Sequence, residues 1–254
     1  MTSSTDSDTG TETGTGSTRP QAAQRRVVVR RRRGSSSRKR RRALLVTGTA
    51  MITVGVLVLG WLAWQFWGTN WVSKGRQADV VAALERDWGD GKVTASTDFG
   101  KASGILRVPR FGADYQVPIL EGSSDEVLAA GVGHMEDTAA VGKQGNYALA
   151  AHRITHGEPF ADFPELQAGD LVHIETAEAD YTYELDTTGT ELVVPFTAGW
   201  VLDPFPVNPE PGGTTAPGRP GDRLITLVTC SELFHTDNRS VAFGHLVEVL
   251  PKTL

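Results

Sequence analysis

Cysteine is nearly absent from this chain of 254 residues, since Cys230 is the only one. A disulfide within the chain is therefore excluded, and the fold must depend on a hydrophobic core instead. No cysteine pair with C-x-x-C spacing stands beside any of the six histidines, which argues against a structural zinc site. We therefore expect no bound metal.

Positive charge is scarce after residue 42. Residues 43–254 hold 13 lysines and arginines against 27 aspartates and glutamates, whereas residues 1–42 hold 12 bases and three acids. A basic domain that binds nucleic acid would not divide its charge in this way, so we expect no nucleic-acid partner. The asymmetry indicates a chain that crosses a boundary between compartments.

Apolar residues are almost missing from the first 24 positions, which consist mainly of Thr, Ser, Gly and Asp. Such a segment cannot bury a core and is typical of disorder. Together with the basic run that follows it, this composition predicts a disordered, basic cytoplasmic tail over residues 1–42.

Residues 43–67 form one long hydrophobic run of 25 positions without a charge. A helix of that length spans about 38 Å, enough to cross a hydrocarbon core of about 30 Å. A buried core helix is seldom apolar on every face for so long, and a cleaved signal peptide has a shorter apolar region. The run ends among tryptophans, which are typical of a membrane interface. It is therefore predicted to be an uncleaved transmembrane signal anchor.

Basic residues are concentrated on one side of this run. Eleven lysines and arginines lie between Arg25 and Arg42, whereas only Lys74 and Arg76 follow closely behind. The positive-inside rule then places the N-terminus in the cytoplasm and residues 72–254 outside the cell. We predict a single-pass protein of the cell membrane whose basic run also contacts anionic lipids.

A short amphipathic helix is expected next along the chain. Val80, Val81, Leu84 and Trp88 recur at helical spacing. Residues 68–100 are therefore predicted to form a juxtamembrane helix followed by a linker.

Strands dominate the predicted structure of residues 101–254, because the apolar pattern changes there to a period of two. A short helix is expected at 123–130. About eight strands are predicted, at residues 105–108, 115–120, 146–152, 171–176, 181–186, 191–196, 223–230 and 240–250. So many short strands in one domain favour a mainly β fold, either a closed barrel or a sandwich.

One loop of this region is unusually long. Residues 197–221 contain six prolines and five glycines and show no periodicity. Loops of this length without secondary structure are uncommon unless they are functional. We therefore interpret the segment as a candidate substrate-binding flap.

The lone cysteine suggests covalent chemistry, because an unpaired thiol outside the cell is exposed to oxidation. Cys230 stands at the exit of an apolar strand, where a side chain can face a cleft while the strand holds it rigid. A nucleophilic cysteine needs a base or a cationic neighbour. His152, at the end of another predicted strand, is a candidate, but His134, His156, His173, His235 and His245 compete with it.

A donor for developing oxyanion charge is also needed. Arg239 precedes the last predicted strand, and Arg153 and Arg223 are its rivals. Periodicity alone does not choose among them.

Three segments together carry a resemblance to a known family. Residues 226–230 (Thr-Leu-Val-Thr-Cys) match the TLxTC signature of sortases, the membrane-anchored cysteine transpeptidases of Gram-positive bacteria. Residues 145–153 resemble the strand of that family that ends in the catalytic histidine, and residues 238–243 resemble the start of its last strand, which carries the catalytic arginine. The Gly133-His134 pair, residues 231–235 and the proline-rich loop are most like the housekeeping class E sortases of actinobacteria.

The resemblance implies an eight-stranded sortase-type β-barrel as the catalytic domain at residues 101–254. It implies Cys230 as nucleophile, His152 as acid and base, and Arg239 as the ligand of the substrate backbone and oxyanion. Ala150, Val228 and Thr229 would bind substrate.

The same resemblance implies cleavage of an LAXTG or LPXTG sorting signal between Thr and Gly through a thioacyl intermediate. Its partners would be surface proteins that carry this signal and an amine of the peptidoglycan precursor. No metal or organic cofactor would be needed.

Three alternatives stay open at the level of sequence. A pilin-polymerising sortase would use a lysine of another protein as the acceptor. A cell-wall cysteine peptidase would hydrolyse without transfer, although papain-like peptidases place the cysteine before the histidine in the chain. A membrane-anchored binding barrel would merely bury Cys230.

Overall fold

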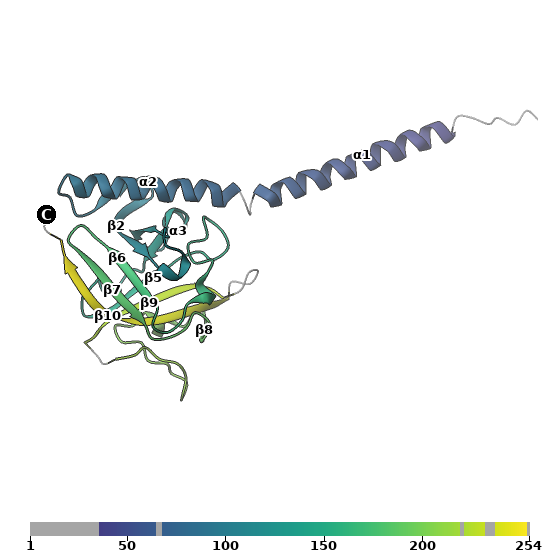
Figure 1. The fold of residues 1–254 in the computed structure, drawn as a ribbon. Coiled ribbons are helices and arrows are strands. Elements are labelled where there is room, and N and C mark those ends of the chain that lie inside the picture. Colours follow the sequence, from purple (N-terminus) through teal and green to yellow (C-terminus); the bar gives the residue numbers. More distant parts are fainter. Residues whose placement is uncertain (1–35, 65–67, 219–220, 232–236, 253–254) are drawn as a thin grey trace, which may run out of the picture. The chain divides into compact units, whose positions relative to one another are not determined.

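The computed structural model describes residues 36–64, 68–218, 221–231 and 237–252 (Figure 1). Residues 1–35 of the predicted tail and residues 65–67 at the end of the predicted anchor lie outside this part of the chain. The chain forms two compact units, residues 1–52 and 53–254.

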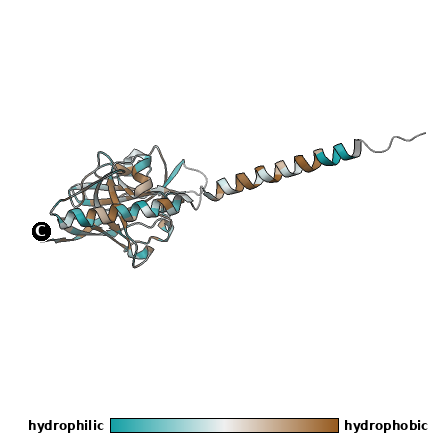
Figure 2. Ribbon diagram, turned by 90° about the horizontal axis from the view of Figure 1, so that it is seen from above, coloured by the Kyte–Doolittle hydropathy of each residue, from teal (hydrophilic) through white to brown (hydrophobic). Residues whose placement is uncertain are grey.

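The first helix, α1 (Ser36–Ala63), is long and apolar enough to cross a membrane. Figure 2 shows its hydrophilic start and its largely apolar remainder. The helix begins seven residues before the predicted anchor at residue 43. Arginine and lysine are good helix formers, so the basic run extends the helix rather than ending it.

The second helix, α2 (Thr69–Gly89), includes the residues whose apolar spacing predicts a helix after the apolar run. Its apolar residues Val80, Val81 and Leu84 are buried against strands β1 to β3 and helix α3. Gly91 follows the helix with a φ of 76°, in the left-handed region that glycine adopts without strain. The helix is thereby attached to the barrel by its own hydrophobic cluster.

Ten strands and four short helices are found in the part of the chain that the structure describes after α2. The strands are β1 (Ala95–Thr97), β2 (Gly100–Arg107), β3 (Val117–Glu121), β4 (Val132–His134), β5 (Gly145–Ala150), β6 (Leu171–Glu175), β7 (Ala179–Leu185), β8 (Leu192–Pro195), β9 (Arg223–Cys230) and β10 (Asn238–Pro251). The short helices are α3 (Asp125–Ala130), η2 (Pro109–Phe111), η3 (Phe163–Glu165) and η4 (Gly199–Leu202).

Eight of these strands close into a barrel. Their order is β2-β3-β4-β5-β9-β10-β7-β6, and β6 pairs back onto β2, where Leu106 stands opposite Ile174. The β3–β4 and β5–β9 pairs are parallel, and the other pairs of the ring are antiparallel. The predicted mainly β fold with an eight-stranded barrel is confirmed.

Which strands form the ring differs from the sequence expectation. The predicted strand at 191–196 is β8, which pairs only with β10 and lies off the ring. The ring instead includes β4, a strand of three residues that was not predicted. Strand β1, also three residues long, lies in the stretch where the sequence predicts a linker. Three residues are too few to display a period of two.

The barrel is filled by large side chains. Tyr183, Phe160 and Phe163 are fully buried inside it, and the two phenylalanine rings lie 5.6 Å apart between centroids. Both phenylalanines come from the loop after β5, so this loop is a part of the core. Burying each such side chain contributes about 1.5–3 kcal/mol, which makes the barrel a rigid support for its rim.

The proline-rich loop is more ordered than predicted. Its helix η4 buries Val201, and the amide of Asn146 donates a hydrogen bond of 3.0 Å to the Val201 carbonyl. Ala216, farther along the loop, is also buried. The prediction of a segment without secondary structure is therefore wrong for its first part.

Candidate active site

Cys230 is the last residue of β9, where the strand leaves the barrel. Side chains alternate between the two faces of a strand. Val228 and Cys230 are accordingly half-buried, while Thr229 between them is buried. The thiol therefore stands on the same face as Val228, at the rim.

Arg239 is brought opposite Cys230 by the antiparallel pairing of β9 and β10. Directly opposed side chains in such a pair have Cβ atoms about 4.5–5.5 Å apart. The guanidinium also donates a hydrogen bond of 3.1 Å from Nη1 to the carbonyl of Asn238. Strand register thus places the side chains of Arg239 and Cys230 on the same face at the rim, where both line one cleft.

His152 reaches the same rim through the parallel pair β5–β9. Ala150 stands opposite Val228, and the amide of Ala151 continues the pairing with a bond of 3.2 Å to the Val228 carbonyl. His152 follows Ala150 by two residues, as Cys230 follows Val228. The predicted strand ran to His152, but β5 ends at Ala150 because the His152 carbonyl accepts the amide of Phe160 from the following loop.

A cleft of about 440 Å³ opens between these elements. Six of its lining residues are those predicted as catalytic or substrate-binding, and six are others. The lining residues are Asp125, Leu128, Ala150, Ala151, His152, Arg153, Ile154, Thr155, Val228, Thr229, Cys230 and Arg239.

Thr229 holds the cleft wall together. Its hydroxyl donates a hydrogen bond of 2.8 Å to the carbonyl of Ala151, across the β5–β9 pair. This bond ties the residue before the histidine to the residue before the cysteine. Ala150 and Val228 line the cleft, half-buried, as apolar surface.

The imidazole of His152 has a perturbed titration. Burial lowers its pKa, and the stacked ring of His156 lowers it further, with the ring centroids 4.7 Å apart. The carboxylate of Asp125 acts in the opposite direction. The balance favours a neutral ring that can accept a proton.

The competing histidines have other partners away from the cleft. His134 lies 2.7 Å from a carboxylate oxygen of Glu121, and His173 lies 3.1 Å from the hydroxyl of Thr182. His235 lies outside the described residues. His156 differs from these histidines because its ring packs against that of His152. The spacing of four residues between the two histidines is the sequence signal for this contact.

The two other candidate arginines, Arg153 and Arg223, differ from Arg239 in their contacts or positions. Arg153 lines the cleft, but its guanidinium donates to the carbonyl of Ser231. Arg223 begins β9, seven residues from Cys230 and therefore about 23 Å away along the strand. Of the three arginines, Arg239 is the one that the strand register places opposite Cys230.

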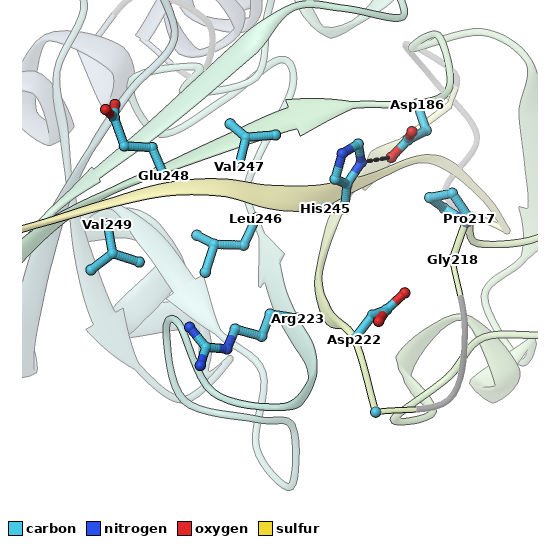
Figure 3. Close-up of a pocket in the computed structure, with 11 residues that line it drawn as sticks. Asp186, Pro217, Gly218, Asp222, Arg223, His245, Leu246, Val247, Glu248 and Val249 are labelled. Atoms are coloured by element: carbon cyan, nitrogen blue, oxygen red, sulfur yellow. Dashed lines mark hydrogen bonds and ion pairs between the residues drawn. The ribbon is translucent and has the colours of Figure 1, made fainter.

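A second cavity of about 610 Å³ lies at that opposite end of the barrel (Figure 3). His245 points there and pairs with Asp186 at 2.7 Å. Pro217 and Gly218 of the proline-rich loop line this cavity, and no described residue of 197–221 lines the cleft at Cys230. The described part of the loop therefore does not cover that cleft, contrary to the expected flap.

No group of three or more His, Cys, Asp or Glu side chains that could hold a metal ion occurs among the residues that the structure describes.

A β-barrel with a cysteine, a histidine and an arginine lining one cleft at its rim is the arrangement expected of a cysteine acyl-transfer protein. A family model of the sortase domain matches residues 106–247. The chain belongs to the sortase family, whose members are cysteine transpeptidases.

Individual relatives agree with this membership. Sortase SrtE1 of Streptomyces coelicolor is 35% identical over 217 residues, which cover 81% of this chain and 58% of that protein. SrtE2 of the same organism is 29% identical over 219 residues, which cover 81% of this chain and 82% of that protein. The chain thus spans just over half the length of the first relative and four fifths of the second.

Solved structures point in the same direction. Sortase E from Streptomyces avermitilis superposes with a TM-score of 0.52 at 34% identity, covering 61% of this chain and 93% of that one. The SrtA sortase from Actinomyces oris has a TM-score of 0.51 at 30% identity, covering 63% and 87%. The expected likeness to class E sortases is confirmed.

Proposed function

We propose that this protein is a membrane-anchored transpeptidase that cleaves an LAXTG or LPXTG sorting signal between Thr and Gly and joins the new carboxyl end to a peptidoglycan amine. One observation carries the proposal: His152, Cys230 and Arg239, from three separate segments, line a single cleft at one end of the barrel.

The first half-reaction follows from that arrangement. The Cys230 thiolate attacks the Thr carbonyl carbon, and Arg239 stabilises the oxyanion that forms. Protonated His152 then delivers its proton to the Gly nitrogen as the carbon–nitrogen bond breaks. The products are a thioester on Cys230 and a free amine on the released peptide.

The second half-reaction reverses the proton transfer. An incoming amine attacks the thioester, neutral His152 takes the proton from its nitrogen, and the sulfur leaves as thiolate. A lowered pKa suits His152 to this second role, because the ring is readily neutral between the two steps.

Apolar side chains favour a peptide with small and aliphatic residues before the Thr. Ala150, Val228, Leu128 and Ile154 line the cleft. We propose that Ala150 and Val228 contact the first two residues of the signal, with Thr229 bracing the wall between them. The domain boundaries at residues 43, 68 and 101 are part of the proposal.

The anchoring is proposed from α1 and its flanks. This helix is long and apolar enough to span a membrane, and eleven lysines and arginines between Arg25 and Arg42 precede or begin it. The positive-inside rule then places the barrel outside the cell.

The test is a reaction of the full chain in detergent with LAXTG and LPXTG peptides and an amine acceptor, followed by mass spectrometry. The proposal predicts cleavage between Thr and Gly and an amide-linked product. A folded protein that yields neither product, or that cleaves elsewhere, would contradict it.

A further inference from the structure

Three consecutive residues in the loop that follows His152 adopt a left-handed backbone. His156, Gly157 and Glu158 have φ values of 56°, 81° and 53°. Glycine takes this conformation freely, but the two flanking residues take it against their intrinsic preference. Such a segment persists only where surrounding contacts hold it.

Helix α2 supplies those contacts through one polar face. Asn70, Ser73 and Gln77 are spaced so that they lie on the same side of the helix. Ser73 is 1% exposed and Gln77 8% exposed, so this face is covered although it is polar.

The contacts are specific hydrogen bonds. The Asn70 side chain accepts the amide of Gly157 at 3.0 Å and donates to a carboxylate oxygen of Glu158 at 2.6 Å. Gln77 donates to the carbonyl of His156 at 3.4 Å. A Cβ at Gly157 would lie 2.5 Å from the Gln77 amide nitrogen, so the loop and the helix are in close contact.

The first residue of this segment, His156, contacts the candidate active site. The His156 ring stacks on His152 with an interplanar angle of 28°. Its Nδ1 also lies 3.0 Å from the Thr155 hydroxyl, which fixes the ring in its plane. A chain of contacts therefore runs from α2 through residues 156–158 to the imidazole of His152.

We propose that α2, through Asn70, is a positioning element for His152, and that His156 is the positioning residue that transmits it. The inference rests on the proposed function, which assigns His152 its proton-transfer role. Attachment of α2 does not require this polar face, since Val80, Val81 and Leu84 already bury the helix against the barrel.

Four other titratable or charged side chains line the cleft around His152, and of these Asp125 acts on the pKa of His152, in the direction opposite to His156. They come from the loop itself, from α3, from β9 and from β10, and they are Arg153, Asp125, Cys230 and Arg239. None of them shares the hydrogen bonds of Asn70, and α3, which carries Asp125, packs on α2 through the apolar cluster instead. The polar link from Asn70 therefore leads to residues 156–158.

A charge-swap experiment on the full chain in detergent tests the link. Asn70→Asp places a second carboxylate against that of Glu158. It is expected to lower kcat about tenfold at nearly unchanged KM, because it displaces His152 but does not alter peptide binding. Adding Glu158→Gln restores a donor and an acceptor and should recover kcat. Asp79→Asn, on an exposed side of α2, is the matched control and should behave like the parent chain.

A histidine NMR titration reads the same link without substrate. The His152 resonance is assigned by its loss in His152→Gln. His156→Phe keeps a stacked ring but removes its charge, so the pKa of His152 should rise. The limb of the kcat/KM profile that belongs to His152 should move to higher pH. In Asn70→Asp, the His152 titration should move toward its ordinary value.

The outcomes separate this inference from the proposed function. If the parent chain processes no sorting peptide, the proposed function fails, while the NMR titration still decides the positioning role. An unchanged His152 titration in both folded variants overturns the inference. So does a loss of kcat in Asn70→Asp that Glu158→Gln fails to recover although both proteins melt at the parental temperature.

Discussion

Arg239 and Cys230 stand directly opposite each other on β9 and β10. A guanidinium presents several N–H donors in one rigid plane, whereas an ammonium group is a compact point charge. The side chain is therefore suited to hold a substrate carbonyl and its oxyanion together. The histidine, by contrast, is placed by the end of β5 and by the loop that follows.

Arg239→Lys tests the need for that planar group. We expect kcat/KM for a sorting peptide to fall by about 10²-fold, as for loss of an oxyanion ligand, because the remaining charge cannot make both contacts. Peptide cleavage assays give the ratio. Arg223→Lys, at the far end of β9, is the control. A near-parental rate in Arg239→Lys would transfer the role to Arg153.

The lowered pKa of His152 has a consequence for stability. Because burial lowers the folded-state pKa below the unfolded value of about 6.5, the unfolded chain binds more protons as pH falls through that region. His152 therefore destabilises the fold in acid. The free energy of unfolding in urea is measured at one pH above and one pH below about 6.5. It should fall less between these two pH values in His152→Gln than in the parent chain. An equal loss in both proteins would refute the assigned direction.

Packing of helix α2 against the barrel contributes to the free energy of unfolding. Leu84 is completely buried in the cluster beneath the helix. Leu84→Ala should reduce the free energy of unfolding by about 2–5 kcal/mol through lost burial and a cavity. Val72→Ala, on an exposed part of the same helix, should change it by no more than about 0.5 kcal/mol. Urea denaturation measures both, and similar values for the two variants would show that α2 is only loosely attached.

The sequence was most informative where a pattern repeats over several residues. The apolar spacing of Val80, Val81 and Leu84 and the alternation in β9 predicted real elements. The sequence does not predict strand β4, because three residues are too few to show a period. The place of β4 in the ring depends on its pairing with β3 and β5. Pairing across the chain is a tertiary property that local pattern does not contain.

The candidate site was predictable for a related reason. Cys230, His152 and Arg239 stand in recognisable motifs, whereas His156 and Asp125 act on His152 only through the fold. The prediction that the proline-rich loop covers the cleft is wrong for its described part, since Pro217 and Gly218 line the cavity at the other end of the barrel. Composition indicated a functional loop but carried no information on its direction.

The whole arrangement predicts a defined orientation in the membrane. Cys230 is the single cysteine, so its labelling reports the location of the barrel without background. A membrane-impermeant maleimide applied to intact cells should label it, because the half-buried thiol lines an open cleft. Cys230→Ala is the blank. Labelling that occurs only after lysis would place the barrel on the cytoplasmic side.

The most direct test of the account is to trap the acyl intermediate. The full chain is mixed with a sorting peptide without amine acceptor, quenched in acid, and analysed by intact and peptide-level mass spectrometry. The account predicts a thioester to the Thr carboxyl on Cys230, removed by an added amine, and no adduct or turnover in a folded Cys230→Ala protein. An acyl group on another residue, or amide product from Cys230→Ala, would contradict it.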